Sequence, residues 1–364
     1  MRYEEYMRVL HIYKTYYPET YGGVENVILQ VAEGARKYGV ECKVLTVSQS
    51  ANPEIIKIHN HEVVRAKTNF RLSSAALSFD FFRKFTQLSE EADLLHYHFP
   101  WPLMDMAHLG LRIKKPSVVS YHLDITKQKF LLPFYRPLQN AFLSSVDRIT
   151  VSSENYMRHS PVLMHFRDKV NVIPLGIDPS SYPKPDSQRI EKWRKQLPAR
   201  FFLFVGVFRY YKGLHYLLEA AKQVDCPLVL VGAGPEEETL KTYARENNLQ
   251  HVHFLGSLDD ADKMALLELC SAFVFPSHLR SESFGISLLE ASMHAKPMIS
   301  CEMGSGTTFV NLHGQTGLAV PPADPNALAG AMRLLWDDPA LAEHYGKNAL
   351  ERFMKLFLGE TMVG

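Results

Sequence analysis

Short runs of β-branched and aromatic residues alternate with helical patterns along the whole chain, and this alternation limits the fold more than any other feature. It predicts βαβ units and therefore an α/β protein with parallel sheets. The expected strands are 8–13, 43–47, 94–98, 117–121, 148–151, 170–173, 201–205, 228–231, 252–255, 273–275 and 298–300. The expected helices are 24–37, 102–113, 213–223, 236–246, 260–269, 285–294, 325–336 and 340–357.

A proline-rich stretch divides this alternation into two halves. Residues 174–185 contain four prolines, which exclude an uninterrupted helix or a central strand. We therefore expect a linker at 174–190, with one domain over 1–180 and another over 190–342. A length of 364 residues suits two domains. Parallel sheets bind ligands at the carboxyl ends of their strands, so two such domains are expected to face each other across a cleft.

Composition excludes several classes of protein. Forty Lys and Arg balance 39 Asp and Glu, so there is no overall basic field for nucleic acid. The four cysteines form no C-x-x-C pair, which argues against zinc and disulfide frameworks and fits a reducing cytoplasm. The amino terminus lacks a signal-peptide pattern, and no apolar run is long enough for a bilayer. We expect a cytoplasmic protein.

Two glutamates, Glu282 and Glu290, flank the start of a predicted helix near Gly285 with E-x7-E spacing. Free N–H groups at a helix start bind phosphate well. One carboxylate is then placed to contact a transferred sugar and the other a ribose, through charge-assisted hydrogen bonds. The alternative without a binding role is that Glu282 is a solvent-exposed loop acid and Glu290 an acid on the helix surface. The strand, the glycine and the apolar helix around the pair disfavour it.

This segment resembles the motif of the retaining glycosyltransferases of family 4, which have the GT-B fold, and the resemblance covers nearly the whole chain. It implies two Rossmann-like domains, with acceptor bound by the first and sugar nucleotide by the second. A carboxy-terminal helix, about 343–364, is expected to pack back on the first domain. By resemblance, Glu282 contacts the donor sugar and Glu290 the ribose. Ser283 and the backbone of Phe284, Gly285 and Ile286 border the diphosphate.

A second segment places cations after a core strand. Gly206 is followed by Arg209, Lys212 and Gly213, a layout that offsets charge on a leaving diphosphate. The segment is similar to the family's G-R-x4-K-G pattern, but Val207 stands where the family has arginine. Lys212 takes the family's lysine role, and assigning the second cation to Arg209 needs a two-residue shift.

Three glycine-containing turns complete the expected donor site. Gly22 and Gly23 stand before a helix and resemble the family's amino-terminal glycine loop, although a tight turn alone would also place glycines there. Gly232 and Gly234 resemble the family's G-x-G-P turn, and Ser257 and Leu258 its base-contacting loop. Any Rossmann-like domain can contain similar turns. No G-x-G-x-x-G follows the first strand, which argues against a dinucleotide cofactor.

Histidines end two expected strands. His122 matches the family's strand-end histidine, which touches the donor sugar, and Asp124 follows it. His96 and His98 are expected to line the cleft and contact the acceptor. A metal site at His-x-His would need a third ligand that the sequence does not indicate, so we expect no metal. Asp260 and Asp262 spell D-x-D but open a helix, where a capping role is expected.

The resemblance implies sugar transfer with retention, from GDP-mannose first and UDP-sugars or GDP-rhamnose next, to a glycan or lipid-linked acceptor. The stretch 205–221 and the amino-terminal run resemble those of bacterial mannosyltransferases of surface polysaccharide assembly. Residues 127–138 mix cations with large apolar residues. This pattern fits two alternatives, peripheral contact with an anionic membrane or a packed helix with a solvated edge. The rival functions are a sugar-nucleotide epimerase and a non-catalytic nucleotide-sugar-binding subunit. No cofactor is expected, because the sugar nucleotide is a substrate.

Overall fold

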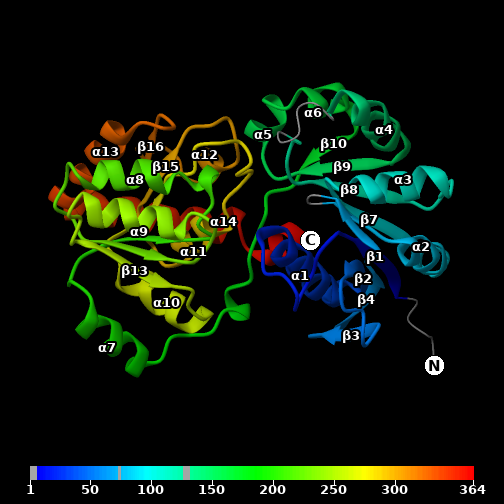
Figure 1. The fold of residues 1–364 in the computed structure, drawn as a ribbon, viewed down its shortest axis with the longest axis horizontal. Helices are drawn as coiled ribbons and strands as arrows, with labels where there is room; N and C mark the ends of the chain where they lie inside the picture. Colours follow the sequence, from blue (N-terminus) through cyan, green and yellow to red (C-terminus); the bar gives the residue numbers. More distant parts are fainter. Residues whose placement is uncertain (1–5, 73–74, 126–131) are drawn as a thin grey trace. The chain divides into compact units, whose positions relative to one another are not determined.

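The computed structural model describes residues 6–72, 75–125 and 132–364. The chain forms two compact units, the first made of residues 1–176 with 359–364 and the second of 177–358 (Figure 1). Each unit is built on its own parallel sheet. The prediction of two α/β domains with Rossmann-like sheets is therefore confirmed.

Eight strands in the order β10-β9-β8-β7-β1-β2-β4-β3 form the sheet of the first unit, and only β3 runs antiparallel to its neighbour. They are β1 (Met7–Ile12), β2 (Val40–Ser48), β3 (Ile55–Ile58), β4 (His61–Lys67), β7 (Leu94–Phe99), β8 (Ser117–Tyr121), β9 (Arg148–Val151) and β10 (Val170–Val172). A separate antiparallel pair consists of β5 (Phe70–Leu72) and β6 (Ala75–Leu77).

The two faces of this sheet carry different residues because strand side chains alternate. Leu10, Ile12, Tyr97 and Phe99 point into the large apolar core under the α2–α4 helices. The opposite face carries Val9 and, two residues on, His11, and is covered by α1 and α15. The helices are α1 (Gly23–Gly34), α2 (Phe79–Glu91), α3 (Pro102–Gly110), α4 (Leu132–Ser145), α5 (Glu154–Arg158), α6 (Pro161–His165) and α15 (Gly359–Val363).

Six strands in the order β13-β12-β11-β14-β15-β16, all parallel, form the sheet of the second unit. They are β11 (Phe202–Val205), β12 (Leu228–Val231), β13 (Val252–Gly256), β14 (Ala272–Phe275), β15 (Met298–Cys301) and β16 (Gly317–Val320). The central strands β11, β12 and β14 are apolar on both faces, as buried parallel strands require.

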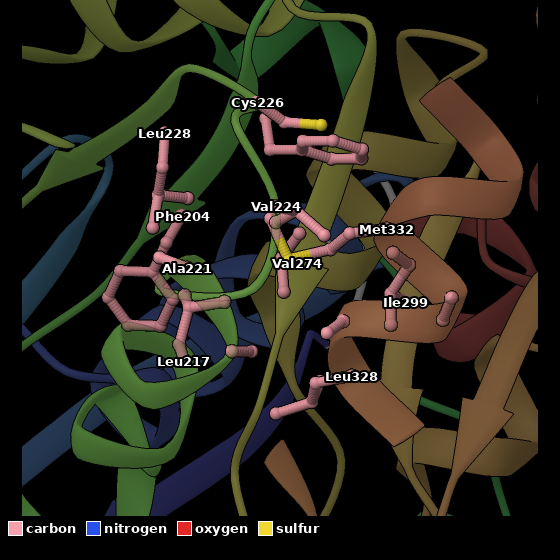
Figure 2. Close-up of a cluster of buried hydrophobic side chains, with 14 of the residues drawn as sticks. Phe204, Leu217, Ala221, Val224, Cys226, Leu228, Val274, Ile299, Leu328 and Met332 are labelled. Atoms are coloured by element: carbon pink, nitrogen blue, oxygen red, sulfur yellow. The ribbon is translucent and has the colours of Figure 1, made fainter. Parts of the chain in front are cut away.

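Helices cover both faces of this second sheet. They are α7 (Ser187–Gln196), α8 (Leu214–Ala221), α9 (Glu237–Glu246), α10 (Asp260–Leu269), α11 (Ile286–Met293), α12 (Thr307–Val310), α13 (Pro325–Asp337) and α14 (Pro339–Leu356). Figure 2 shows part of the core, where Phe204 and Val274 of the sheet lie among Leu217 of α8 and Leu328 and Met332 of α13. Cys226 belongs to this core, and all four cysteines are buried and unpaired, as their apolar surroundings indicate.

The helix expected at 340–357 is confirmed as α14, but the prediction for the part of the chain that packs on the first unit was wrong in its bounds. A single helix over 343–364 was expected on the first unit. Instead, α14 ends at Leu356 and packs on α11 inside the second unit, and only residues 359–364 belong to the first. Phe357, between the two helices, is fully buried against Phe284 and Phe309. The expected linker also differs, because α7 begins at Ser187 with Asp186 as its N-cap.

Candidate active site

The second unit places its two charged motif residues on loops that follow neighbouring central strands. Strand β11 lies between β12, which follows it in sequence, and β14 on its other side. The strand order reverses at β11 and β14, and such a switch point opens a crevice at the carboxyl ends of the strands. Lys212 follows β11 and Glu282 follows β14. The topology thus explains why residues 70 positions apart can meet.

Lys212 and Glu282 form an ion pair at this switch point. The Lys212 ammonium donates a hydrogen bond to Oε2 of Glu282, and the side chains are only 10% and 13% exposed. The ammonium also lies 4.6 Å from the ring centroid of Phe275, the last residue of β14. Low exposure strengthens such a pair, because less water screens the two charges. The pair is preformed, so neither group needs a large rearrangement to meet a ligand.

The start of α11 lies just beyond Glu282. Gly285 is its N-cap, with φ of +91°, and no side chain caps the helix there. A Cβ on Gly285 would come within 3.0 Å of the Phe275 ring, so the site demands glycine. Phe284 is buried, and Ser283 accepts a hydrogen bond from Gly306 N–H at 2.7 Å. The first turn of α11 therefore offers backbone donors of the kind that bind phosphate.

Glu290, one turn further into α11, is buried and paired with a lysine that the sequence analysis did not single out. Lys263 of α10 donates to Oε1 of Glu290 at 2.9 Å and also pairs with Asp260 at 2.8 Å. Burial alone would lower the pKa of Lys263, but the carboxylates of Glu290 and Asp260 raise it above its usual value. Glu290 therefore stands in a charged pair between α10 and α11.

The glycine turns of the second unit pack directly on one another. A Cβ on Gly232 would lie 2.0 Å from the Gly206 carbonyl oxygen, and one on Gly234 would lie 2.5 Å from that of Phe208. Close packing alone therefore requires these two glycines. Val207 and Arg209 are exposed on the adjoining loop, and Ser257 and Leu258 are exposed and half-buried after β13.

Gly213 gives a direct test of the loop that carries Lys212. Its φ is +70°, and a Cβ there would lie 2.1 Å from the Pro276 carbonyl oxygen. Gly39 has nearly the same φ, +73°, with no described atom within 4 Å of such a Cβ. We expect G213A to lower the free energy of unfolding by about 2–4 kcal/mol and G39A by about 1 kcal/mol. Urea titration of each variant measures the difference, and equal losses would contradict the crowding at Gly213.

In the first unit, the glycine loop precedes α1. Gly22 is the N-cap of α1 and Gly23 its first residue, and both are exposed. The next turn is fixed by Glu25, whose Oε1 accepts hydrogen bonds from Thr15 at 2.9 Å and Thr20 at 2.7 Å. This network holds the loop between β1 and α1 in a defined shape, so its backbone can approach a ligand without reordering.

The strand-end histidines form one cluster, and the structure adds a member. His122 follows β8 and pairs with His98 at 3.0 Å, while His96 pairs with Ser120 at 2.7 Å. His11 of β1, which the sequence analysis missed, pairs with His98 at 3.1 Å. One nitrogen from each of His11, His96 and His98 lies within 4.8 Å of the others, a donor set that a divalent metal could use. His11 therefore supplies the third possible metal ligand that the sequence did not indicate.

Burial keeps this cluster neutral. It lowers the pKa of His96 to about 4 and that of His122 to about 3, and the pKa values of His11 and His98 fall well below the usual range. Desolvation is the leading cause for all four, since the charged imidazolium loses its water. At neutral pH each ring is therefore both one donor and one acceptor.

Two further acids turn out to be tied into the structure. Asp124 accepts hydrogen bonds from the Tyr121 hydroxyl at 2.9 Å and the Ser160 hydroxyl at 2.6 Å. Asp262 accepts from the Trp193 indole at 2.9 Å and pairs with Arg189. The cap of α10 is Asp259, one residue before the expected Asp260. Through these partners, both acids hold neighbouring segments of the chain together.

The mixed basic and apolar stretch falls partly outside the described residues, which omit 126–131. Beyond that gap, Phe134 of α4 is 83% exposed. Among the described residues, no helix combines the length and apolar character needed to span a bilayer.

Comparison with known proteins identifies the family. Residues 21–181 match the family model described as Glycosyltransferase Family 4, and residues 186–352 match Glycosyl transferases group 1. A D-rhamnosyltransferase, WbpZ, from Pseudomonas aeruginosa is 53% identical over 96% of this chain and 92% of its own. The chain belongs to glycosyltransferase family 4. O-antigen chain mannosyltransferase C from Escherichia coli is 45% identical, over 98% and 96% of the two chains.

Solved structures support the fold of this family 4 glycosyltransferase. Sucrose-phosphate synthase from Thermosynechococcus elongatus superposes with a TM-score of 0.82 at 23% identity, over 98% of this chain and 96% of that one. Anabaena HepE, solved with UDP and glucose, gives 0.79 at 20% identity, over 98% and 97%. The prediction of the GT-B fold is confirmed.

Proposed function

We propose that this glycosyltransferase moves mannose from GDP-mannose, with retention, to a glycan or lipid-linked acceptor of a bacterial surface polysaccharide. The observation that carries the proposal is the Lys212–Glu282 pair, which stands at the strand-order switch beside the uncapped start of α11. A cation, a carboxylate and free N–H groups together suit a diphosphate that carries a sugar. The name of the Escherichia coli relative supports mannose and an O-antigen chain.

We propose that Lys212 stabilises the charge on the departing diphosphate, and that Arg209 and the N–H groups of α11 are further donors to it. As the bond between the anomeric carbon and the phosphate oxygen breaks, negative charge grows on the phosphate, and these groups stabilise it. The acceptor oxygen forms the new bond to the anomeric carbon. Its proton passes to the leaving phosphate, so that atoms and charge balance without another base.

The remaining assigned residues hold the donor. Glu282 accepts hydrogen bonds from sugar hydroxyls, His122 gives one to the same sugar, and Glu290 binds the ribose. The glycine turns at Gly22, Gly23, Gly206, Gly232 and Gly234 let the backbone approach phosphate and base. Ser257 and Leu258 border the base, and His96, His98 and Asp124 belong to the acceptor side. The protein needs no metal in this scheme, because lysine and N–H groups supply the positive charge.

A second donor is favoured by one observation. The Pseudomonas aeruginosa relative, 53% identical, is a D-rhamnosyltransferase. GDP-D-rhamnose differs from GDP-mannose in lacking one sugar hydroxyl, so the two can share every contact to the nucleotide. The identity of the sugar therefore depends on contacts to that single position, and a pocket that hydrogen-bonds the extra hydroxyl rejects the sugar without it.

Thermal unfolding and turnover with a donor panel test the proposal. We expect GDP-mannose at about 100 times its dissociation constant to stabilise the protein by about 2.7 kcal/mol, with a smaller effect of UDP-glucose. Transfer is then measured with a lipid-linked glycan acceptor. Greater turnover with GDP-D-rhamnose than with GDP-mannose would make GDP-D-rhamnose the assigned donor. Conversion of the donor without acceptor would favour an epimerase, and binding without transfer a non-catalytic subunit.

A further inference from the structure

Three imidazoles form a continuous hydrogen-bonded row on one face of the first unit's sheet. His11 lies on β1, His98 on β7 and His122 just after β8, and these strands are neighbours in the sheet. His11 is opposite His96, and His98 is opposite Ser120, so all the side chains share a face. Nδ1 of His11 lies 3.1 Å from Nε2 of His98, and Nδ1 of His98 lies 3.0 Å from Nε2 of His122.

Such a row has only two possible arrangements of protons. With one N–H on each neutral ring, each of the two hydrogen bonds joins the N–H of one ring to a bare nitrogen of the next. Either every ring donates toward His122, or every ring donates toward His11. The first arrangement leaves a bare Nε2 on His11 and an N–H at Nδ1 of His122. The second leaves an N–H at Nε2 of His11 and a bare Nδ1 on His122.

The buried end of the row selects between the two. His11 is fully buried, and its Nε2 has no hydrogen-bond partner among the described residues. An orphaned N–H in the interior is rarer and more costly than an unused acceptor. We propose that His11 and His98 act as a relay that fixes the tautomer of His122, with His98 donating to Nε2 of His122 and leaving Nδ1–H of His122 as the donor that the row does not use.

The relay gives a positioning role to two residues with no substrate contact of their own. Resting on the proposed function, it makes His122 a fixed hydrogen-bond donor to the sugar, never an acceptor. A fixed tautomer is pre-organised, so no energy is lost in choosing it when the donor binds. His98 and His11 then matter through His122.

A bound metal is the competing explanation of the same side chains. His11, His96 and His98 offer nitrogens within 4.8 Å of one another. However, both nitrogens of His98 are engaged in the row, and Nε2 of His96 pairs with Ser120 at 2.7 Å. Metal binding through His98 would break at least one of these hydrogen bonds, so we favour the relay and make metal binding an outcome of the test.

Long-range ¹H–¹⁵N spectra of the full chain, labelled with ¹⁵N-histidine at pH 7, read the tautomer directly. H122N identifies the His122 signals by their loss. In the wild type we expect a proton on Nδ1 of His122 and a bare Nε2. The reverse would overturn the relay, and so would zinc at one equivalent shifting the His11, His96 and His98 signals together.

Two nearly isosteric variants then test the direction of donation. The amide of H98N can donate as His98 does, so Nε2 of His122 should stay bare. The carboxylate of H98D only accepts, so Nε2 should gain a proton. With a proton on Nε2, His122 either has a bare Nδ1, which cannot donate to the sugar, or becomes an imidazolium, which is repelled by the cationic anomeric carbon. Both states are unfavourable for transfer.

We expect kcat of H98D to fall about tenfold below that of H98N, with the donor KM within about threefold. A bare Nε2 in H98D, or a protonated one in H98N, would overturn the relay. The expected tautomers with equal kcat would support the relay and refute the contact between His122 and the sugar.

Discussion

Replacing Lys212 with alanine should lower kcat by about 10²–10³-fold, the range found when one preorganised donor to a developing charge is lost. The reason is geometric, because Lys212 is the ammonium that the fold brings to the switch point beside α11. Initial rates at saturating donor and acceptor measure the effect.

The Lys212 variant needs a control for charge and one for stability. K222A removes an exposed lysine from the end of the neighbouring helix, where Lys222 pairs with Glu219 at 3.5 Å, and should leave kcat within about twofold. K212A also leaves the Glu282 carboxylate without its partner, which should cost about 1–3 kcal/mol of unfolding free energy. The double variant K212A/E282Q should regain that stability but not the rate. A double variant that recovers the rate would mean that Lys212 serves folding alone.

Local motifs made this pair predictable. Lys212 and Glu282 each stand in a short segment whose strand, glycine and helix are contiguous in sequence. The sequence pattern therefore predicted both residues and the loops on which they lie. The ion pair itself needed the strand order, because β11 and β14 are neighbours only in the folded sheet.

Partners from distant segments could not be found in this way. Lys263 reaches Glu290 from a different helix, and its own segment is an ordinary acidic helix start. His11 stands between Leu10 and Ile12 in an apolar strand, where it has the pattern of a core residue. Only its register opposite His96 shows that it belongs to a cluster.

Elements with weak patterns were missed for related reasons. Strand β4 contains His61, Glu62 and Arg65, which break the apolar run that predicts a buried strand, and Arg65 pairs with Glu19 at 3.2 Å. Helix α7 is almost wholly polar, and Trp193 is its only buried residue. Its stability comes from tertiary contacts to α10, which propensity cannot reveal.

Acid should unfold the first unit steeply, because its buried histidines are neutral when folded. Burial lowers the pKa of His108 and His96 to about 4 and of His122 to about 3, from an ordinary 6.5. Below pH 6.5 the unfolded chain takes up protons that the folded chain refuses, so stability falls with pH. Each histidine contributes about 1.4 kcal/mol per pH unit between 6.5 and its folded pKa. His11 and His98 act in the same direction.

One buried acid opposes this trend. Burial raises the pKa of Asp105 to about 8 from 3.8, more than its hydrogen bond from Tyr135 lowers it. The folded state therefore binds a proton below pH 8 that the unfolded state takes up only near pH 4, so stability rises by about 1.4 kcal/mol per unit as pH falls across that range. Stability of the first unit should peak near pH 6.5 and then fall by about 3 kcal/mol or more per unit.

Urea unfolding at pH 8, 6.5 and 5 measures this profile, with variants to assign it. A loss of about 4 kcal/mol by pH 5 approaches the whole stability of many domains, so unfolding is expected between pH 5 and 4. H108N keeps an acceptor for the Tyr97 hydroxyl, which lies 2.7 Å from Nδ1 of His108, and should reduce the acid slope by about 1.4 kcal/mol per unit. H159Q, at an exposed histidine, should leave the slope unchanged. A stability that instead rises by about 1.4 kcal/mol per unit from pH 6.5 to 5, as Asp105 alone would give, would mean that the buried histidines protonate in the folded state, and a neutral relay through His98 would then be untenable.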